Sequence, residues 1–169
     1  MTSGIDGFST ATEMLAALDR RDVSSAELTD MQIERIERLD GKINAVVVRD
    51  FAAARERAVV ADARRAAGEP LGKLDGLPHT LKESTAAAGL PQTAAMPPFA
   101  GHIAEADGPV AAKVRAAGGV LLGKTNIPPF LADIQSNNTT YGRSLNPWNA
   151  APPTNCPICW RHPLRDWKS

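Results

Sequence analysis

Lys82 is the residue of this sequence whose type and setting most directly suggest chemistry. It stands at the end of a short candidate strand, His79 to Lys82, that follows Gly76-Leu77-Pro78. A lysine in that setting could direct its amine into a cleft. Burial there would favour the neutral amine, which can accept a proton. The alternative is a solvated or ion-paired lysine at a strand edge, and these residues alone leave both interpretations open.

A second candidate is Gly118–Thr125, which satisfies the phosphate-binding pattern Gly-x-x-x-x-Gly-Lys-Thr literally. A true loop of this kind follows a strand, and its Lys-Thr pair opens a helix that faces the phosphates. Here we expect a helix before Gly118, an apolar strand between the glycines, and a turn at Pro128 and Pro129. Nucleotide binding is therefore a remote alternative.

The third candidate, Cys156-x-x-Cys159-x-x-His162, has the spacing of half a zinc site. A structural zinc normally takes four ligands, and the sequence has no other cysteines. We therefore expect no metal site there. His102 falls in a predicted loop, and we expect it to be solvated.

The elements that must position Lys82 begin with helices. Two capping boxes, Thr10-x-x-Glu13 and Ser24-x-x-Glu27, predict a short helix over 14–18 and a longer one to about Leu39. At about 100° per residue, one side of the longer helix collects apolar residues and Ile33 falls off that side. The residues that share the side are Leu28, Met31, Ile36 and Leu39.

The rest of the chain alternates strands and helices. A β-branched strand (43–48) and an Ala-rich helix (51–67), which Gly68 ends, precede the strand of Lys82. Asp107-Gly108-Pro109 then opens a helix, and a short apolar strand, 120–122, follows it. Strand, helix, strand predicts a right-handed crossover. The predicted fold class is α/β, with N-terminal helices and then βαβ units of a mostly parallel, mixed sheet. We expect the helix after Gly108 to bury Val110, Val114 and Ala117.

The composition excludes several classes of protein. Basic and acidic residues number 19 each, so no net charge favours nucleic acid or an anionic membrane. The apolar runs are too short to span a bilayer, and the first residues lack the features of a signal peptide. We therefore expect a cytoplasmic protein without disulfides.

From Leu74 to Asn149 the sequence resembles the amidase signature family of serine hydrolases. The resemblance continues more loosely into the N-terminal helices. Six motifs, in the order of that family, carry the resemblance. They are Gly76-Leu77-Pro78 with Lys82, Ala88-Gly89-Leu90-Pro91-Gln92-Thr93, Gly108-Pro109-Val110, Gly123-Lys124-Thr125-Asn126, Ser136-Asn137-Asn138 and Asn146-Pro147-Trp148.

The resemblance implies that Lys82 is the general base. In the family a neutral lysine draws a proton, through a bridging serine, from a nucleophilic serine that attacks the amide carbonyl. The products are an acid and ammonia or an amine, and the reaction needs neither metal nor cofactor. A small-molecule amide is the implied substrate, although one branch of the family acts on a tRNA-linked amide in a complex. The resemblance also suggests that Asn137, Asn138, Tyr141 and Arg143 line the edge of the cleft, where they otherwise read as turn and surface residues.

The sequence departs from the family at several positions. Glu83 and Ser84 replace the usual Asp and Asn, and His79 and Thr80 replace apolar residues, which is expected to weaken packing beside Lys82. Ala150–Cys156 stands where the family has a Gly- and Ser-rich loop with both catalytic serines. We therefore interpret 1–150 as the N-terminal part of an amidase signature domain and 151–169 as an aberrant tail, produced by a frameshift or a misjoined gene.

Without either serine, we expect the chain to be inactive. The alternative is a non-catalytic binding module on an amidase scaffold, with Trp160 and Trp167 as anchors for a partner. We also expect the strand 120–122 to be uncovered on one face, which would favour self-association. The sequence does not indicate which amide is the substrate.

Overall fold

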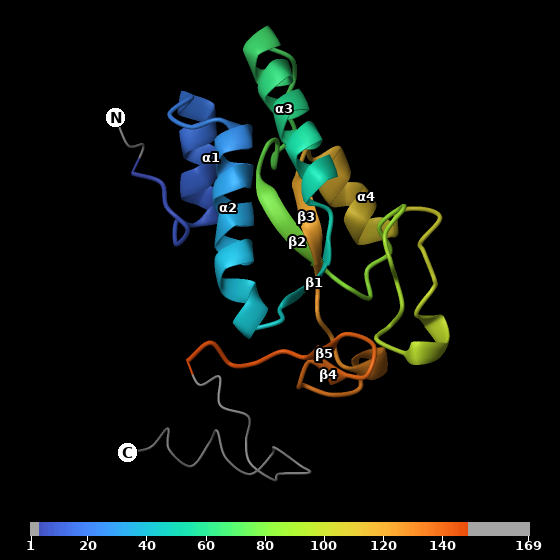
Figure 1. The fold of residues 1–169 in the computed structure, drawn as a ribbon. Coiled ribbons are helices and arrows are strands. Elements are labelled where there is room, and N and C mark those ends of the chain that lie inside the picture. The colour runs from blue at the N-terminus through green and yellow to red at the C-terminus, as the bar shows by residue number, and fades with distance from the viewer. Residues whose placement is uncertain (1–3, 149–169) are drawn as a thin grey trace.

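The computed structural model describes residues 4–148 (Figure 1). Four α-helices and five strands lie in this part of the chain. In chain order they are α1 (Ala11–Arg20), α2 (Ser25–Leu39), β1 (Val46–Arg49), α3 (Phe51–Ala67), β2 (Pro78–Lys82), α4 (Pro109–Ala116), β3 (Val120–Thr125), β4 (Asn137–Asn138) and β5 (Gly142–Arg143). Short 3-10 turns occupy Asp40–Lys42, Pro97–Phe99 and Pro129–Leu131.

Local sequence determines how the helices begin and end. Both predicted capping boxes form: the Thr10 and Ser24 side chains accept hydrogen bonds from the backbone N–H groups of Glu13 and Glu27. Each glutamate in turn accepts a hydrogen bond from the backbone N–H of its capping residue. Gly68 ends α3 with a left-handed backbone (φ +70°), as predicted. These boundaries could be predicted because the interactions that fix them span only a few residues.

The predicted buried side of α2 is wrong in part. Ile33 is fully buried, whereas Leu39 is 42% exposed. Ile33 packs against Ala54 and Ala58 of α3, and Leu28 packs in a separate cluster with Leu18 of α1. The helix therefore buries two sides against two neighbours, which a single apolar stripe does not describe.

The main sheet is mixed and has the strand order β1-β3-β2 (Figure 1). β2 runs parallel to β3, with α4 between them in sequence, and β1 runs antiparallel to β3. This confirms the predicted α/β class. β3 extends to Thr125, three residues beyond its predicted end, because Gly123, Lys124 and Thr125 pair with both neighbouring strands.

Gly123 allows β1 and β3 to approach each other closely. Its backbone has φ +154°, and a Cβ atom added there would lie 2.1 Å from the carbonyl oxygen of Val48. That oxygen belongs to the backbone of β1 and cannot move aside without breaking the strand pairing. The position therefore requires glycine.

The expectation that β3 is uncovered is wrong. Residues 120–122 are between 1% and 6% exposed. Val120 and Leu122 pack under α2 and α3, and Leu121 packs in the cluster that includes Ala111 of α4. The physical ground for self-association through this strand is therefore absent. Exposed large apolar side chains lie elsewhere, at Phe8, Leu39, Val59, Val60, Leu71, Phe99, Ile103, Val110, Phe130, Leu131, Ile134 and Trp148.

The predicted buried side of α4 is wrong in part. Val110 was expected to be buried but is 55% exposed, and Ala111 is the buried residue of this helix. Val114 and Ala117 are only half-buried, and Ala117 lies just beyond the end of the helix. Ala111 packs in a cluster with Leu121 of β3. Within residues 4–148, no helix has the length and apolar character needed to cross a membrane.

Candidate active site

Lys82 is the last residue of β2 and pairs in register with Thr125 of β3. Its predicted place at the end of a strand is therefore correct. Its side chain is exposed. Residues 4–148 therefore do not provide the burial that the sequence suggested for this lysine.

The next residue, Glu83, is fully buried. One carboxylate oxygen, Oε1, accepts hydrogen bonds from the backbone N–H and the hydroxyl of Thr93, at 2.6 and 2.9 Å. It also accepts one from the Tyr141 hydroxyl at 3.0 Å. The other oxygen, Oε2, is buried and has no hydrogen-bond partner within the described part of the chain. Glu83 thus joins segments that are 10 and 58 residues away in sequence.

Lys124 of β3 is a second buried charged residue near this point, and its side chain is fully enclosed. Its amine donates a hydrogen bond to the carbonyl oxygen of Pro91. Burial lowers the pKa of the Lys124 amine, and the negative charge of Glu83 acts in the opposite direction. The sequence singled out Lys124 only within the phosphate-loop pattern and the Gly123–Asn126 motif, and it did not predict the burial of this lysine. The predicted strand ended at Leu122, whereas β3 continues to Thr125.

The position of Lys124 also bears on the phosphate-loop alternative. Lys124 and Thr125 lie within β3 and do not open a helix. The amine of Lys124 is directed at Pro91 and is inaccessible to a ligand. The segment therefore lacks the helix N-terminus on which phosphate binding depends.

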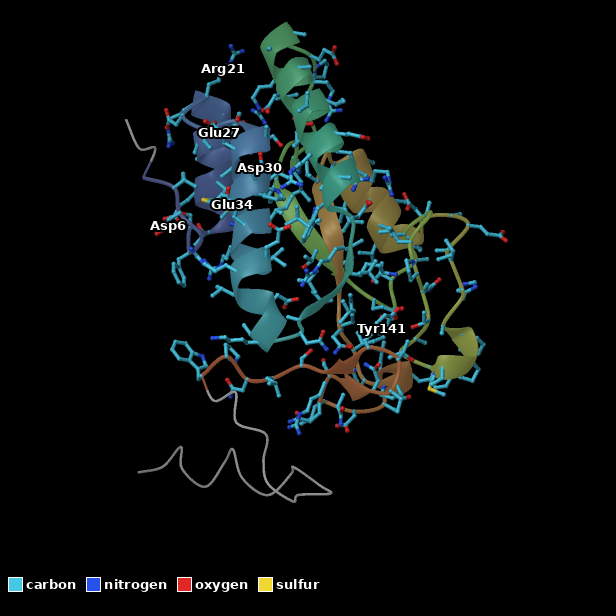
Figure 2. The ribbon with its side chains drawn as sticks, viewed as in Figure 1. Asp6, Arg21, Glu27, Asp30, Glu34 and Tyr141 are labelled. Carbon is cyan, nitrogen blue, oxygen red and sulfur yellow. The ribbon has the colours of Figure 1, made fainter. Side chains whose placement is uncertain are left out.

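Tyr141 lies in the loop that joins β4 to β5, near the end of the main sheet (Figure 2). Burial raises the pKa of its phenol, a hydrogen bond with Thr93 at 3.2 Å opposes this effect, and the bond and charge of Glu83 add to it. The backbone N–H of Tyr141 donates to the Asn138 side chain at 2.6 Å. Tyr141 therefore connects the hairpin to Glu83.

Amide side chains attach the same hairpin to the end of β3. Asn138, which is 8% exposed, donates to the side-chain oxygen of Asn126 and to the carbonyl oxygen of Ile127, both at 2.8 Å. Asn126 donates to the Ser144 hydroxyl at 3.0 Å. Asn137 is exposed and Arg143 is half-buried. Of the four residues suggested to line a cleft edge, Asn138 and Tyr141 thus have mainly internal contacts.

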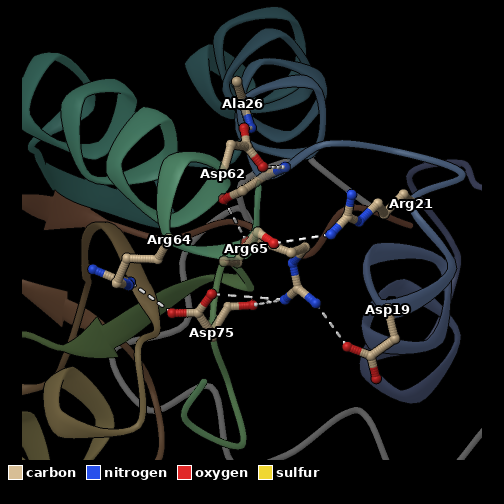
Figure 3. A network of polar contacts seen from close by, with 9 residues as sticks. Asp19, Arg21, Ala26, Asp62, Arg64, Arg65 and Asp75 are labelled. Atoms are coloured by element: carbon tan, nitrogen blue, oxygen red, sulfur yellow. Dashed lines mark hydrogen bonds and ion pairs between the residues drawn. The ribbon is translucent and has the colours of Figure 1, made fainter. Parts of the chain in front are cut away.

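A network of charged residues holds the segment before β2 (Figure 3). The Asp75 side chain is 2% exposed and accepts a hydrogen bond from Arg64 of α3 at 2.6 Å. Arg65 lies 3.7 Å from the other Asp75 oxygen and also binds the exposed Asp19 at 2.8 Å. Asp62 of α3 accepts hydrogen bonds from the first backbone N–H groups of α2. The contacts of Asp75 with Arg64 and Arg65 fix the start of the strand that carries Lys82, and those of Asp62 join α3 to α2.

Two histidines, His79 and His102, also lie in the described part of the chain. His79 lines a small cavity together with Arg57, Leu81 and Arg115. The expected weakening of the packing beside Lys82 stays a prediction. Burial lowers the pKa of the His79 imidazole, a hydrogen bond with Leu77 opposes this, and the charges of the two arginines add to it. His102 is exposed, as predicted.

Several candidates lie outside the described residues: Cys156, Cys159, Trp160, His162 and Trp167. Within residues 4–148, no group of three or more His, Cys, Asp or Glu side chains is arranged to hold a metal ion.

Comparison with known proteins identifies the family. The family model described as Amidase matches residues 27–152. An acylamidase of Rhodococcus erythropolis is 38% identical over 138 residues, which are 82% of this chain and 29% of that protein. A glutamyl-tRNA(Gln) amidotransferase subunit of Salinispora arenicola is 37% identical over 139 residues, 82% of this chain and 28% of that protein.

Similarity of the fold to solved structures indicates the same family. The crystal structure of a bacterial aryl acylamidase of the amidase signature enzymes superposes with a TM-score of 0.76 and 30% identity, covering 85% of this chain and 30% of that one. The chain belongs to the amidase family. It spans somewhat under a third of the length of the relatives it matches.

Proposed function

We propose that this chain represents the part of an amidase signature hydrolase that supplies the general base. The reaction is hydrolysis of a carboxylic acid amide to an acid and ammonia or an amine. Lys82 is the residue to which we assign the proton-accepting role. The observation that carries this proposal is the place of Lys82 at the carboxyl end of β2, in the family's motif order and beside a strongly fixed Glu83.

The geometry around Lys82 supports this assignment over one to Lys124. A general base must reach the proton that it removes, so its amine must be open to the reacting groups. Lys82 is exposed, whereas Lys124 is fully buried and bonded to a backbone carbonyl. Lys124 therefore serves the structure, and Lys82 remains available for the reaction.

We further propose that residues 1–169 do not turn over amides when they are produced alone. A base without a hydroxyl to activate performs no acyl transfer. The segment Ala150–Cys156 offers no counterpart to the family's two serines. The first experiment is an assay of the 169-residue chain for release of ammonia or amine from simple aliphatic and aromatic amides. Turnover that Lys82→Ala abolishes would contradict this part of the proposal.

A second experiment tests Lys82 directly by supplying the missing part of the family's domain. Residues 27–148 replace the matching segment of the Rhodococcus erythropolis acylamidase, and the hybrid is assayed with an acyl amide. We expect Lys82→Ala to reduce turnover by at least about a hundredfold, the scale of general-base catalysis. Lys42→Ala, in the short turn after α2, is the matched control. Equal effects of the two variants would show that Lys82 is not the base.

The substrate class stays broad in this proposal. The acylamidase and the amidotransferase subunit match this chain at 38% and 37% identity, so similarity does not separate the two branches. We therefore propose an amide of a carboxylic acid and name no particular acid.

A further inference from the structure

We propose that Glu83 is a positioning residue, which holds the β4–β5 hairpin against the end of β2, next to Lys82. The catalytic meaning of this inference rests on the proposed function. The structural connection on which it depends can be tested without any enzyme activity.

The backbone at Glu83 is fixed before its side chain makes any contact. The Glu83 N–H donates to the carbonyl oxygen of Thr125 at 3.0 Å, which extends the pairing of β2 with β3 by one residue. Successive side chains of an extended chain point to opposite sides. Lys82 is accordingly exposed, and Glu83 is directed into the interior.

The Glu83 carboxylate is the point where three segments meet. Its Oε1 atom accepts two bonds from Thr93 and one from Tyr141, and all three are 3.0 Å or shorter. Hydrogen bonds to an ionised carboxylate are about twice as strong as neutral ones. Burial lowers the pKa of the Lys124 amine and the charge of Glu83 opposes that effect, so these two buried side chains interact.

The contact with Tyr141 matters because of where the hairpin leads. Tyr141 precedes the segment 142–148, and in the amidase family the loop with the catalytic serines follows the motif Asn146-Pro147-Trp148. The Tyr141–Glu83 bond joins this segment to the residue next to Lys82. It ties the hairpin directly to the residue that follows the strand of the proposed base.

A single spectroscopic signal reports this bond. The sequence has one tyrosine, so the phenolate absorbance in the near ultraviolet reports Tyr141 alone. In Glu83→Gln the carboxylate charge is removed, and we expect the phenol to titrate at lower pH than in the parent chain. Glu56→Gln, an exposed residue of α3, is the matched control and should leave the titration unchanged.

A second variant separates the bond from simple unfolding. Thr93→Val removes a hydroxyl whose single proton is shared between the Glu83 carboxylate and the Tyr141 oxygen, at 2.9 and 3.2 Å. This contact lowers the pKa of Tyr141, so the phenol of the variant should titrate at higher pH. Unfolding would move the titration in the opposite direction, because it would remove the burial that raises the Tyr141 pKa. A higher titration pH in Thr93→Val therefore belongs to the folded network. For Glu83→Gln, a far-ultraviolet circular dichroism spectrum equal to that of the parent chain separates the expected lower titration pH from unfolding.

Amide hydrogen exchange then tests the positioning role. In Glu83→Gln we expect exchange in the hairpin, 137–143, to rise about tenfold, while exchange in β3 at 120–122 stays as in the parent chain. Glu83→Asp keeps the charge and should restore part of the protection. Unchanged phenol titrations, or an equal rise of exchange in the hairpin and in β3, would overturn the inference. Either result would leave the test of Lys82 in the hybrid enzyme unaffected.

Discussion

Arg65 of α3 binds two carboxylates that differ sharply in burial, which allows a controlled test of the network in Figure 3. Asp75 is 2% exposed and Asp19 is 72% exposed. Asn replaces either aspartate with nearly the same shape and no charge. The comparison of Asp75→Asn with Asp19→Asn therefore contrasts a buried carboxylate, paired with Arg64 and Arg65, with an exposed carboxylate paired with Arg65.

The expected effects follow from exposure. Removing one member of a buried pair costs about 3–5 kcal/mol of unfolding free energy, because the remaining charge is left uncompensated. Arg64, the nearest partner of Asp75, is 34% exposed, and water can partly solvate it. We therefore expect Asp75→Asn to lower the unfolding free energy by roughly 2–3 kcal/mol, which is less than for a fully buried pair. Asp19→Asn should cost at most about 1 kcal/mol, as exposed pairs do.

The assay is urea unfolding followed by far-ultraviolet circular dichroism, with thermal unfolding as a second measurement. For a domain of about 150 residues, 1 kcal/mol corresponds to roughly 2–4 °C in Tm, so Asp75→Asn should lower Tm by about 4–12 °C. The double variant should fall near the sum of the two single effects only if Arg65 does not couple them. Equal losses in the two single variants would refute the argument that burial determines the strength of this network.

Two further predictions concern the core and the response to pH. Ile33→Ala should lower the unfolding free energy by about 2–5 kcal/mol. Leu39→Ala, at an exposed position of the same helix, should lower it by less than about 1 kcal/mol. Urea unfolding of both variants measures the difference, and a larger loss for Leu39→Ala would contradict the observed packing. Because the folded protein lowers the pKa of His79 from its ordinary value of 6.5, the neutral imidazole favours folding above that pH, and this contribution is lost as the pH falls below it. Stability should therefore decline more between about pH 7 and 5.5 in the parent chain than in His79→Gln, and parallel declines would show that His79 is not responsible.

The sequence predicts well those features that depend on neighbouring residues. The capping boxes at Thr10 and Ser24, the end of α3 at Gly68 and the strand before Lys82 all have local causes. The buried side of α2 could not be obtained in the same way. Ile33 is buried because α3 and β3 lie against it, and its spacing within α2 does not record those neighbours.

The same distinction applies to the candidate site, where a local motif could be predicted and contacts between distant segments could not. Lys82 was found because a motif of consecutive residues marks it. The network beside it was not found, because its members come from separate parts of the chain. Glu83 meets Tyr141 across 58 residues, and Lys124 meets Pro91 across 33. Fully buried charges such as these are rare, and only the folded chain shows which partners stabilise them.

The tight crossing at Gly123 has an evolutionary consequence. Any side chain there would collide with the backbone of β1, so natural selection for a foldable chain preserves glycine at this position whether or not amides are hydrolysed. Lys82 is exposed and supports no comparable packing, so the fold does not constrain the side chain at that position. Among descendants of this gene, we therefore expect the fold to tolerate substitutions at position 82 and to exclude them at position 123.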